Sequence, residues 1–261
     1  MFWGYSFIFD NIPSERFGLY ILNFESGLSE ANNADISIVT KEIQRRPVNY
    51  FLGVSQSAPL TFDIDFVSPT AIDGNVRSII NKYLFGQTGY KKLQIMQCDL
   101  SNVYFNCFLV NPRNIYTGNE NIGYKATVVC DSPFAWEFPK TVSKTYGETI
   151  TSDTFNFFNT SADNDYMYPN ITFKTNALGD SISIVNESDG DREFEFTNID
   201  ALETVTVDND RQIVTSSSGE NRLGDFNKKW FRLVSGKNVL SVSGGLESFT
   251  MTYQLARKVG G

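Results

Sequence analysis

The chain is organised around residues 227–244, which run NKKWFRLVSGKNVLSVSG. Two apolar-rich segments flank the polar stretch 235–238, where Gly236 and Asn238 tolerate the positive φ of a tight turn. The pattern predicts a β-hairpin. Residues 249–255 follow at once and alternate apolar with polar side chains, which is the period of a half-buried strand. We therefore expect the chain to end in a β-meander that packs on another sheet.

The residues before this stretch predict a second half built of short strands. Turn-forming residues recur about every ten positions, a spacing typical of a sandwich or barrel. Expected strands cover 154–158, 170–174, 181–185, 192–196, 204–207 and 212–215.

The first half is also rich in strand patterns but contains one helix. Apolar side chains recur at helical spacing over residues 71–84, Thr70 and Asp73 have the spacing of a capping box, and Gly86 suits the helix end. Expected strands cover 5–9, 17–22, 92–96, 103–110, 113–116 and 123–130.

A domain boundary is expected near residue 137. Pro133 and Pro139 bracket aromatic residues and stiffen the chain, and the polar residues 140–147 show no helical period. We therefore predict a mainly β protein with domains at 1–137 and 138–261.

A long two-armed β segment is predicted within the first domain, with arms at 35–43 and 60–67. The residues between the arms, 44–53, combine two arginines with aromatic side chains, a composition enriched at protein–protein interfaces. We expect Arg45, Arg46, Tyr50 and Phe51 to form a subunit interface. The alternative is a loop that folds back on its own domain.

Composition describes a folded, acidic chain of 261 residues, 41% hydrophobic and 20% charged. No apolar run approaches the ~20 residues that span a bilayer, and the N-terminus lacks the pattern of a signal peptide. Synthesis in a cytoplasm is therefore expected. The net charge of -8 argues against binding nucleic-acid phosphates or anionic membranes.

The residue types present argue against most catalytic and metal-binding sites. The absence of histidine excludes Ser-His-Asp and Cys-His catalysis and histidine-ligated zinc. Cys98, Cys107 and Cys130 lack metal-site spacing; Cys98 and Cys107 either face each other across a hairpin or pack as reduced, small apolar residues.

Carboxylates are the remaining candidates. Asp63 and Asp65 share one face of a strand, either as a catalytic pair or as a solvated face. The aspartate pairs either hold calcium or form turns, and none matches an EF-hand. They are Asp163/Asp165, Asp189/Asp191 and Asp208/Asp210. We predict no catalytic, cofactor-binding or metal-binding residues, and no enzyme activity.

Several segments, in order and spacing, resemble the distal tail proteins of bacteriophages with long non-contractile tails, over nearly the full length of the chain. The matching segments are 5–9 with Asn11 and Pro13, 81–85 with 90–93, 124–126 with 132–135, 207–209 with 226–233 and 236–238, and 253–258.

The resemblance implies a tail-tube-like β-sandwich domain with one α-helix and a long β-hairpin, followed by a galectin-like β-sandwich. It implies a homo-hexameric ring at the tail tip of the virion, with a tail tube protein on one side and a tail-associated hub or fibre protein on the other. Receptor-binding proteins are further partners in the family, and DNA passes through the ring without sequence-specific binding. Neither a cofactor nor a membrane is implied.

Two alternatives come from other classes of protein. A carbohydrate-binding module would stack sugars on Trp230, Tyr166 or Tyr168. Trp230, which lies within the predicted hairpin, is alternatively a core residue. A glycoside hydrolase would use paired carboxylates.

Overall fold

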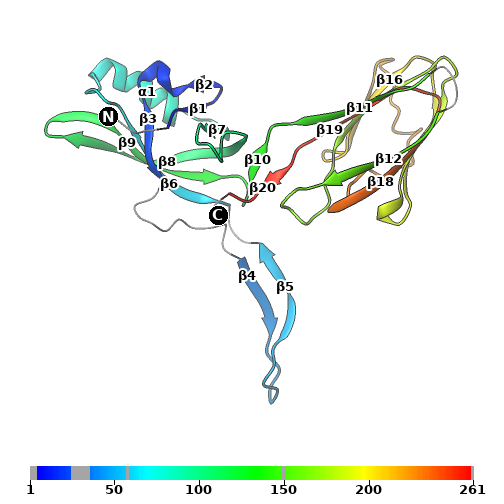
Figure 1. Cartoon of the computed structure of the whole chain (residues 1–261), viewed down its shortest axis with the longest axis horizontal. Coiled ribbons are helices and arrows are strands. Elements are labelled where there is room, and N and C mark those ends of the chain that lie inside the picture. The colour runs from blue at the N-terminus through cyan, green and yellow to red at the C-terminus, as the bar shows by residue number, and fades with distance from the viewer. Residues whose placement is uncertain (1–4, 25–35, 57–58, 148–150, 260–261) are drawn as a thin grey trace. The chain divides into compact units, whose positions relative to one another are not determined.

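The computed structural model describes residues 5–24, 36–56, 59–147 and 151–259. The chain forms two compact units, one of Met1–Glu137 with Ala256–Gly261 and one of Phe138–Leu255 (Figure 1). Each unit has its own apolar core.

Unit 1 is built on a nine-stranded antiparallel sheet. Its main path runs β2-β1-β7-β8-β9-β6-β3, while β10 pairs with β8 and with β20. The strands are β1 (Phe7–Phe9), β2 (Ile12–Pro13), β3 (Tyr20–Phe24), β6 (Thr61–Val67), β7 (Lys91–Ile95), β8 (Val103–Thr117), β9 (Glu120–Cys130), β10 (Ala135–Glu137) and β20 (Ala256–Arg257), and a short 3-10 helix spans Ser14–Phe17.

Helix α1 (Gly74–Phe85) begins three residues later than the periodicity predicts. Asp73, rather than Thr70, caps it, and its carboxylate accepts a hydrogen bond from the Asn75 backbone N–H at 3.4 Å. Ile80 and Leu84 are buried in the core of unit 1, so the inward half of the predicted apolar stripe packs as expected.

The predicted arms of the long hairpin are partly wrong. Strand β4 (Ile36–Lys41) pairs with β5 (Tyr50–Gln56), whereas residues 61–67 form β6 in the main sheet between β3 and β9. Ile64 and Phe66 of β6 are fully buried. Apolar side chains at alternate positions are typical of a strand with one face on a core. These side chains bury more apolar surface in the main sheet than they would in a free hairpin arm.

Unit 2 consists of two antiparallel sheets around a core rich in phenylalanine. One sheet has the order β11-β19-β13-β16-β17 and the other β12-β18-β14-β15. The strands are β11 (Lys140–Thr145), β12 (Thr151–Asn159), β13 (Asn170–Thr175), β14 (Asp180–Asn186), β15 (Arg192–Ile199), β16 (Thr204–Asp208), β17 (Ile213–Ser216), β18 (Gly236–Gly244) and β19 (Leu246–Tyr253), and a second 3-10 helix spans Glu187–Asp189.

Residues 227–244 do not form the predicted hairpin. Residues 227–235 form no strand, and β18 and β19 lie in different sheets. Asn238 is buried instead of lying in an open turn: its amide oxygen accepts from the Val234 N–H at 2.9 Å, and its amide NH₂ donates to the Val234 carbonyl at 2.9 Å. Asn238, a residue type common in turns, thus fixes the loop that precedes β18.

The chain passes from one sheet to the other at Gly244 and Gly245. Gly244 has φ +116°, and a Cβ atom there would collide with the backbone oxygen of Ser181. A Cβ atom on Gly245 would collide with the oxygen of Gly179. The backbone therefore needs glycine at this crossing.

The division between the two units falls between Glu137 and Phe138. The polar residues 140–147 follow at once and contain β11, which pairs with β19 over six residues. The end of the chain returns to unit 1, where β20 pairs with β10 and Arg257 forms an ion pair with Glu137.

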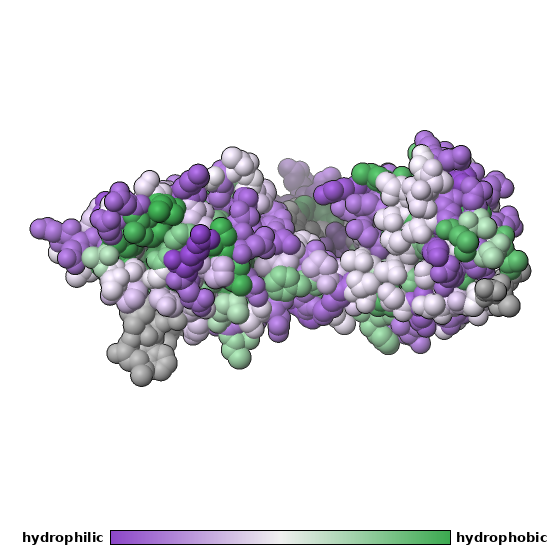
Figure 2. All heavy atoms as spheres, turned by 90° about the horizontal axis from the view of Figure 1, so that it is seen from above, coloured by the Kyte–Doolittle hydropathy of each residue, from purple (hydrophilic) through white to green (hydrophobic). Residues whose placement is uncertain are grey.

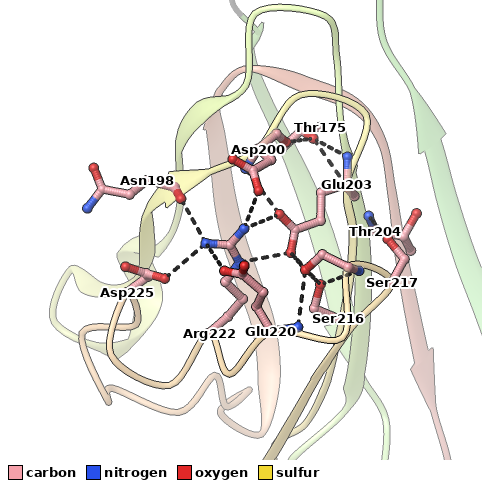
Figure 3. Close-up of polar contacts among 11 residues, drawn as sticks. Thr175, Asn198, Asp200, Glu203, Thr204, Ser216, Ser217, Glu220, Arg222 and Asp225 are labelled. Atoms are coloured by element: carbon pink, nitrogen blue, oxygen red, sulfur yellow. Dashed lines mark hydrogen bonds and ion pairs between the residues drawn. The ribbon is translucent and has the colours of Figure 1, made fainter.

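A buried arginine holds together the loops at one end of unit 2 (Figure 3). The Arg222 side chain is 8% exposed, and its Nε and Nη2 atoms donate to the two oxygens of Glu203 at 2.9 and 2.7 Å. Nη2 also donates to Asp200 at 2.6 Å, and Nη1 donates to the Asn198 carbonyl at 3.2 Å. This bidentate pair fixes the loop before Phe226 to the β15–β16 connection.

Glu203 is held as a carboxylate by these contacts. Burial would raise its pKa, but hydrogen bonds from Arg222, from the hydroxyls of Ser216 and Ser218 and from the Asp200 N–H outweigh burial and lower the pKa to about 2. A carboxyl group with a lowered pKa stabilises the folded state above its ordinary pKa and loses that contribution as pH falls.

We expect the free energy of unfolding of unit 2 to fall between about pH 5 and pH 2 by roughly 3 kcal/mol from this group, because Glu203 must then be protonated. Glu203→Gln should be destabilised at pH 7 and should show a shallower acid limb in urea unfolding measured at several pH values. Glu195→Gln, on the outward face of β15, serves as the control and should keep the wild-type acid limb. Equal acid limbs in wild type and Glu203→Gln would contradict the assignment.

Candidate assembly interface

The hairpin of β4 and β5 carries an unusual density of exposed apolar side chains. Seven large ones lie on it or at its tip, each 39–70% exposed. They are Ile38, Val39, Ile43, Val48, Tyr50, Phe51 and Leu52. Solvent-exposed apolar groups concentrated on one element are typical of a protein–protein contact.

The four residues predicted for an interface all lie in this hairpin or its tip. Arg46 Nη1 donates to the Tyr50 hydroxyl at 2.6 Å, and the Arg46 N–H donates to the Ile43 carbonyl at 3.1 Å. Arg45 adopts φ +69°, and Phe51 is 65% exposed opposite Thr40 in the ladder. The tip therefore presents two cationic and two aromatic side chains on a closed turn.

In the part of the chain that the structure describes, β4 and β5 pair with each other and with no further strand (Figure 1). A bulge between Val39 and Thr40 lies opposite Gly53, whose φ is +152°. A two-stranded ladder without a packed face is marginally stable in water. Residues 38–52 are all exposed, so the described part of the hairpin does not fold back on its own domain.

Helix α1 provides a second exposed apolar surface on unit 1. Val76 and Ile79 belong to the stripe predicted to dock on the sheet, but they are 41% and 57% exposed. Figure 2 shows hydrophobic side chains gathered among hydrophilic ones over the side of unit 1 that carries the helix.

Asp63, one of the two carboxylates of β6, is engaged with side chains of β9. Asp63 accepts a hydrogen bond from the Thr127 hydroxyl at 2.8 Å and lies 3.4 Å from Lys125 Nζ. The Thr127 hydrogen bond is the largest influence on Asp63 and, with Lys125 and Arg113, lowers its pKa. Asp63 lines a polar pocket of about 320 Å³. Asp63 therefore serves as a hydrogen-bond and ion-pair acceptor for side chains of the neighbouring strand β9.

Two of the three aromatic residues named for sugar stacking contact protein groups, and Tyr168 is 40% exposed. Trp230 is half-buried and packs edge-on against Phe226, with ring centroids 4.9 Å apart. The Arg232 guanidinium lies 3.7 Å from the centre of the Tyr166 ring and binds Asp189 through two hydrogen bonds, at 2.7 and 3.1 Å. One face of Tyr166 is therefore covered, and Trp230 packs against the core of unit 2 as a partly buried side chain.

The aspartate pairs proposed as calcium ligands serve local structure. Asp163 accepts from the Asp165 N–H at 3.1 Å, and Asp208 accepts from the Arg211 N–H at 2.9 Å. Among the described residues, no three side chains of the metal-binding types come together. The helices in the described ranges are too short or too polar to cross a bilayer.

The comparisons with known proteins define the class. Residues 2–132 match the family described as "Phage tail protein N-terminal domain", and residues 134–253 match "Phage tail C-terminal domain". The chain belongs to this family of phage tail proteins, which confirms the class predicted from sequence.

Particular relatives agree with this class. A SPbeta prophage-derived uncharacterized protein, YomH of Bacillus subtilis (strain 168), is 25% identical over 240 residues, which cover 91% of this chain and 92% of YomH. Among solved structures, SPP1 Dit, described as a paradigm of the hub adsorption apparatus in phages that infect Gram-positive bacteria, has a TM-score of 0.69 at 13% identity over 96% of this chain and 99% of Dit. A chain of the phage P2 baseplate has a TM-score of 0.54 at 9% identity over 97% of this chain and 98% of its own length. The mainly β fold predicted from sequence is thus that of a known tail hub protein.

We expect Phe51→Ser and Leu52→Ser, singly or together, to change the free energy of unfolding of the isolated chain by less than about 0.5 kcal/mol, because both side chains are already in water. Phe66→Ser, on the buried face of β6, is the contrasting variant and should cost several kcal/mol. Urea unfolding followed by circular dichroism measures both. A loss at Phe51 comparable to that at Phe66 would mean that the hairpin packs within its own chain.

Proposed function

We propose that this protein forms a hexameric ring at the tip of a phage tail, where it joins the tail tube to the adsorption proteins and leaves a central channel for DNA. The observation that carries the proposal is the exposed β4–β5 hairpin, which has the composition of an interface and no packed face of its own among the described residues. The similarity in fold to SPP1 Dit and to a phage P2 baseplate chain supports the location at the tip.

A ring of identical subunits requires two different surfaces on each copy, because every contact is head-to-tail. Unit 1 offers two exposed apolar surfaces on separate elements, the hairpin and the outer face of α1 with Val76 and Ile79. The hairpin is the projecting partner in this arrangement, with Arg45, Arg46, Tyr50 and Phe51 at the contact.

Charge supports contact with another copy of the same chain. Residues 36–56 contain Lys41, Arg45 and Arg46 against a single acidic residue, Glu42, while the whole chain carries a net charge of -8. A basic hairpin is therefore attracted to the acidic remainder of a neighbouring subunit. The same acidic surplus lets DNA pass without binding to the wall of a channel.

In this proposal unit 2 is the galectin-like sandwich. It lies outside the ring, where the adsorption proteins would bind it. Buried phenylalanines fill its core, and the Arg222–Glu203 pair holds together the loops at one end. Unit 2 can therefore serve as a rigid platform for protein partners. Tail tube protein, tail-associated hub or fibre protein and receptor-binding proteins are the partners we assign to the ring. No catalytic step is part of this role.

We expect the double variant Arg45→Ala/Arg46→Ala to keep the fold of the wild type and to weaken the ring, because it removes the cationic tip of the hairpin. Light scattering should give six times the mass of one chain for wild type and a smaller average mass for the variant at the same concentration. Arg211→Ala, an exposed arginine of unit 2, is the matched control and should assemble as wild type. An unchanged mass for the double variant would refute the role of the two arginines.

The location has a separate test. Gold-labelled antibodies raised against unit 2 should mark the distal end of the tail in electron micrographs of intact virions. Label along the tail shaft, or at the junction of tail and head, would contradict the hub assignment whatever the oligomeric state in solution.

A further inference from the structure

Two of the three cysteines meet across the centre of the unit 1 sheet. Cys107 of β8 is the direct register partner of Cys130 of β9, and both side chains are free thiols with 0% exposure in the apolar core. Cys98 is exposed and does not face Cys107; the facing pair is Cys107 with Cys130, and these two pack as reduced, small apolar residues, which is the other alternative drawn from the sequence.

Cys107 and Cys130 occupy a non-hydrogen-bonded position of the β8–β9 pair, where facing side chains are closest. The Asp131 N–H donates to the Asn106 carbonyl at 2.9 Å, so the hydrogen bond joins the residues that flank the pair. The Cys130 N–H points the other way and donates to Leu60 at 2.9 Å. Cys107 and Cys130 therefore form a non-hydrogen-bonded antiparallel pair, with Cα atoms ~4.5 Å apart, and a disulfide accepts Cα separations of ~4.4–6.8 Å.

We propose that Cys107 and Cys130 form a cross-strand disulfide after the tail protein leaves the reducing cytoplasm in which it is made. Two S–H bonds break and one S–S bond forms, and the two electrons and two protons pass to dioxygen, which becomes hydrogen peroxide. Membership of the phage tail family supplies the change of compartment, because a released virion meets an oxidising medium. The proposal does not depend on the ring or on the hub assignment.

Burial makes this oxidation slow and alkali-dependent. Loss of solvent raises the pKa of both thiols, with Asp131 adding to the effect, and the pKa of Cys130 reaches about 12. Lys91, the β7 register partner of Cys107, is bound to Asp10 at 2.9 Å. Because the thiolate is the species that reacts, the rate should rise roughly tenfold for each pH unit between pH 7 and pH 9.

The bridge would tie together two neighbouring strands at the middle of the nine-stranded sheet. It closes the chain between Cys107 and Cys130 and so restricts the unfolded state. The oxidised protein should therefore unfold at a temperature higher by roughly 10 °C, and a reducing agent should reverse the shift.

The test uses the full chain with Cys98→Ser, which removes the exposed thiol and leaves the core pair. The protein is incubated in dioxygen-saturated buffer at pH 7, 8 and 9, unfolded, alkylated and digested for mass spectrometry. The expected result is a linked pair of peptides containing Cys107 and Cys130, no alkylation at either position, and a higher unfolding temperature by calorimetry.

Cys98→Ser/Cys107→Ser is the matched control and should keep one alkylatable thiol and show no linked peptide. If that variant does not fold, the oxidised and reduced forms of Cys98→Ser still decide the question, because they share one sequence. The proposal is overturned if both core thiols are fully alkylated after conditions that oxidise a reference dithiol peptide, or if the wild type forms a bridge that includes Cys98.

Discussion

The constraint on which unit 2 depends is the passage of the backbone between its two sheets at Gly244 and Gly245. No side chain fits at either position, because neighbouring backbone oxygens occupy the space that a Cβ atom would need. With this crossing in place, β18 and β19 present Leu240, Val242, Phe249 and Met251 to one core from opposite sides. Each sheet then buries one face, which is the arrangement that antiparallel sheets with alternating side chains require.

Alternation predicts strands well in this chain and their pairing poorly. The strict pattern of residues 60–67 and 249–255 identifies β6 and β19 from local information, because the period of side chains on a strand is independent of its partner. Which strands pair with each other depends instead on how the apolar side chains pack in the core. Asn238 illustrates the failure: its residue type suggests an open turn, but its amide bonds to Val234 and Asn186 in a buried position. The start of α1 shows the same limit, since the capping-box spacing puts the cap at Thr70 and the structure puts it at Asp73, three residues later.

The position of the candidate contact surface could be predicted from sequence in part. Arginine and aromatic residues in 44–53 indicate a contact surface, and the structure places them at the tip of a hairpin. The partner strand was misassigned because residues 50–56 alternate weakly, while residues 60–67 alternate strictly. The Arg222–Glu203 pair has no signal in the sequence at all: 19 positions separate the residues, and neither lies in a recognisable motif. Only folding brings such a pair together, so long-range polar contacts escape local patterns.

The exposed hairpin also has a consequence for the subunit before assembly. Within the described ranges the β4–β5 ladder has no further strand at its edges, and such edges beside apolar side chains can accept a strand from another copy, which favours open-ended aggregation. Two hairpins carry the same sign of charge and repel each other, whereas a hairpin and the acidic remainder of another chain attract. The basic residues at the tip thus disfavour contact between two hairpins, which is the contact that leads to aggregation.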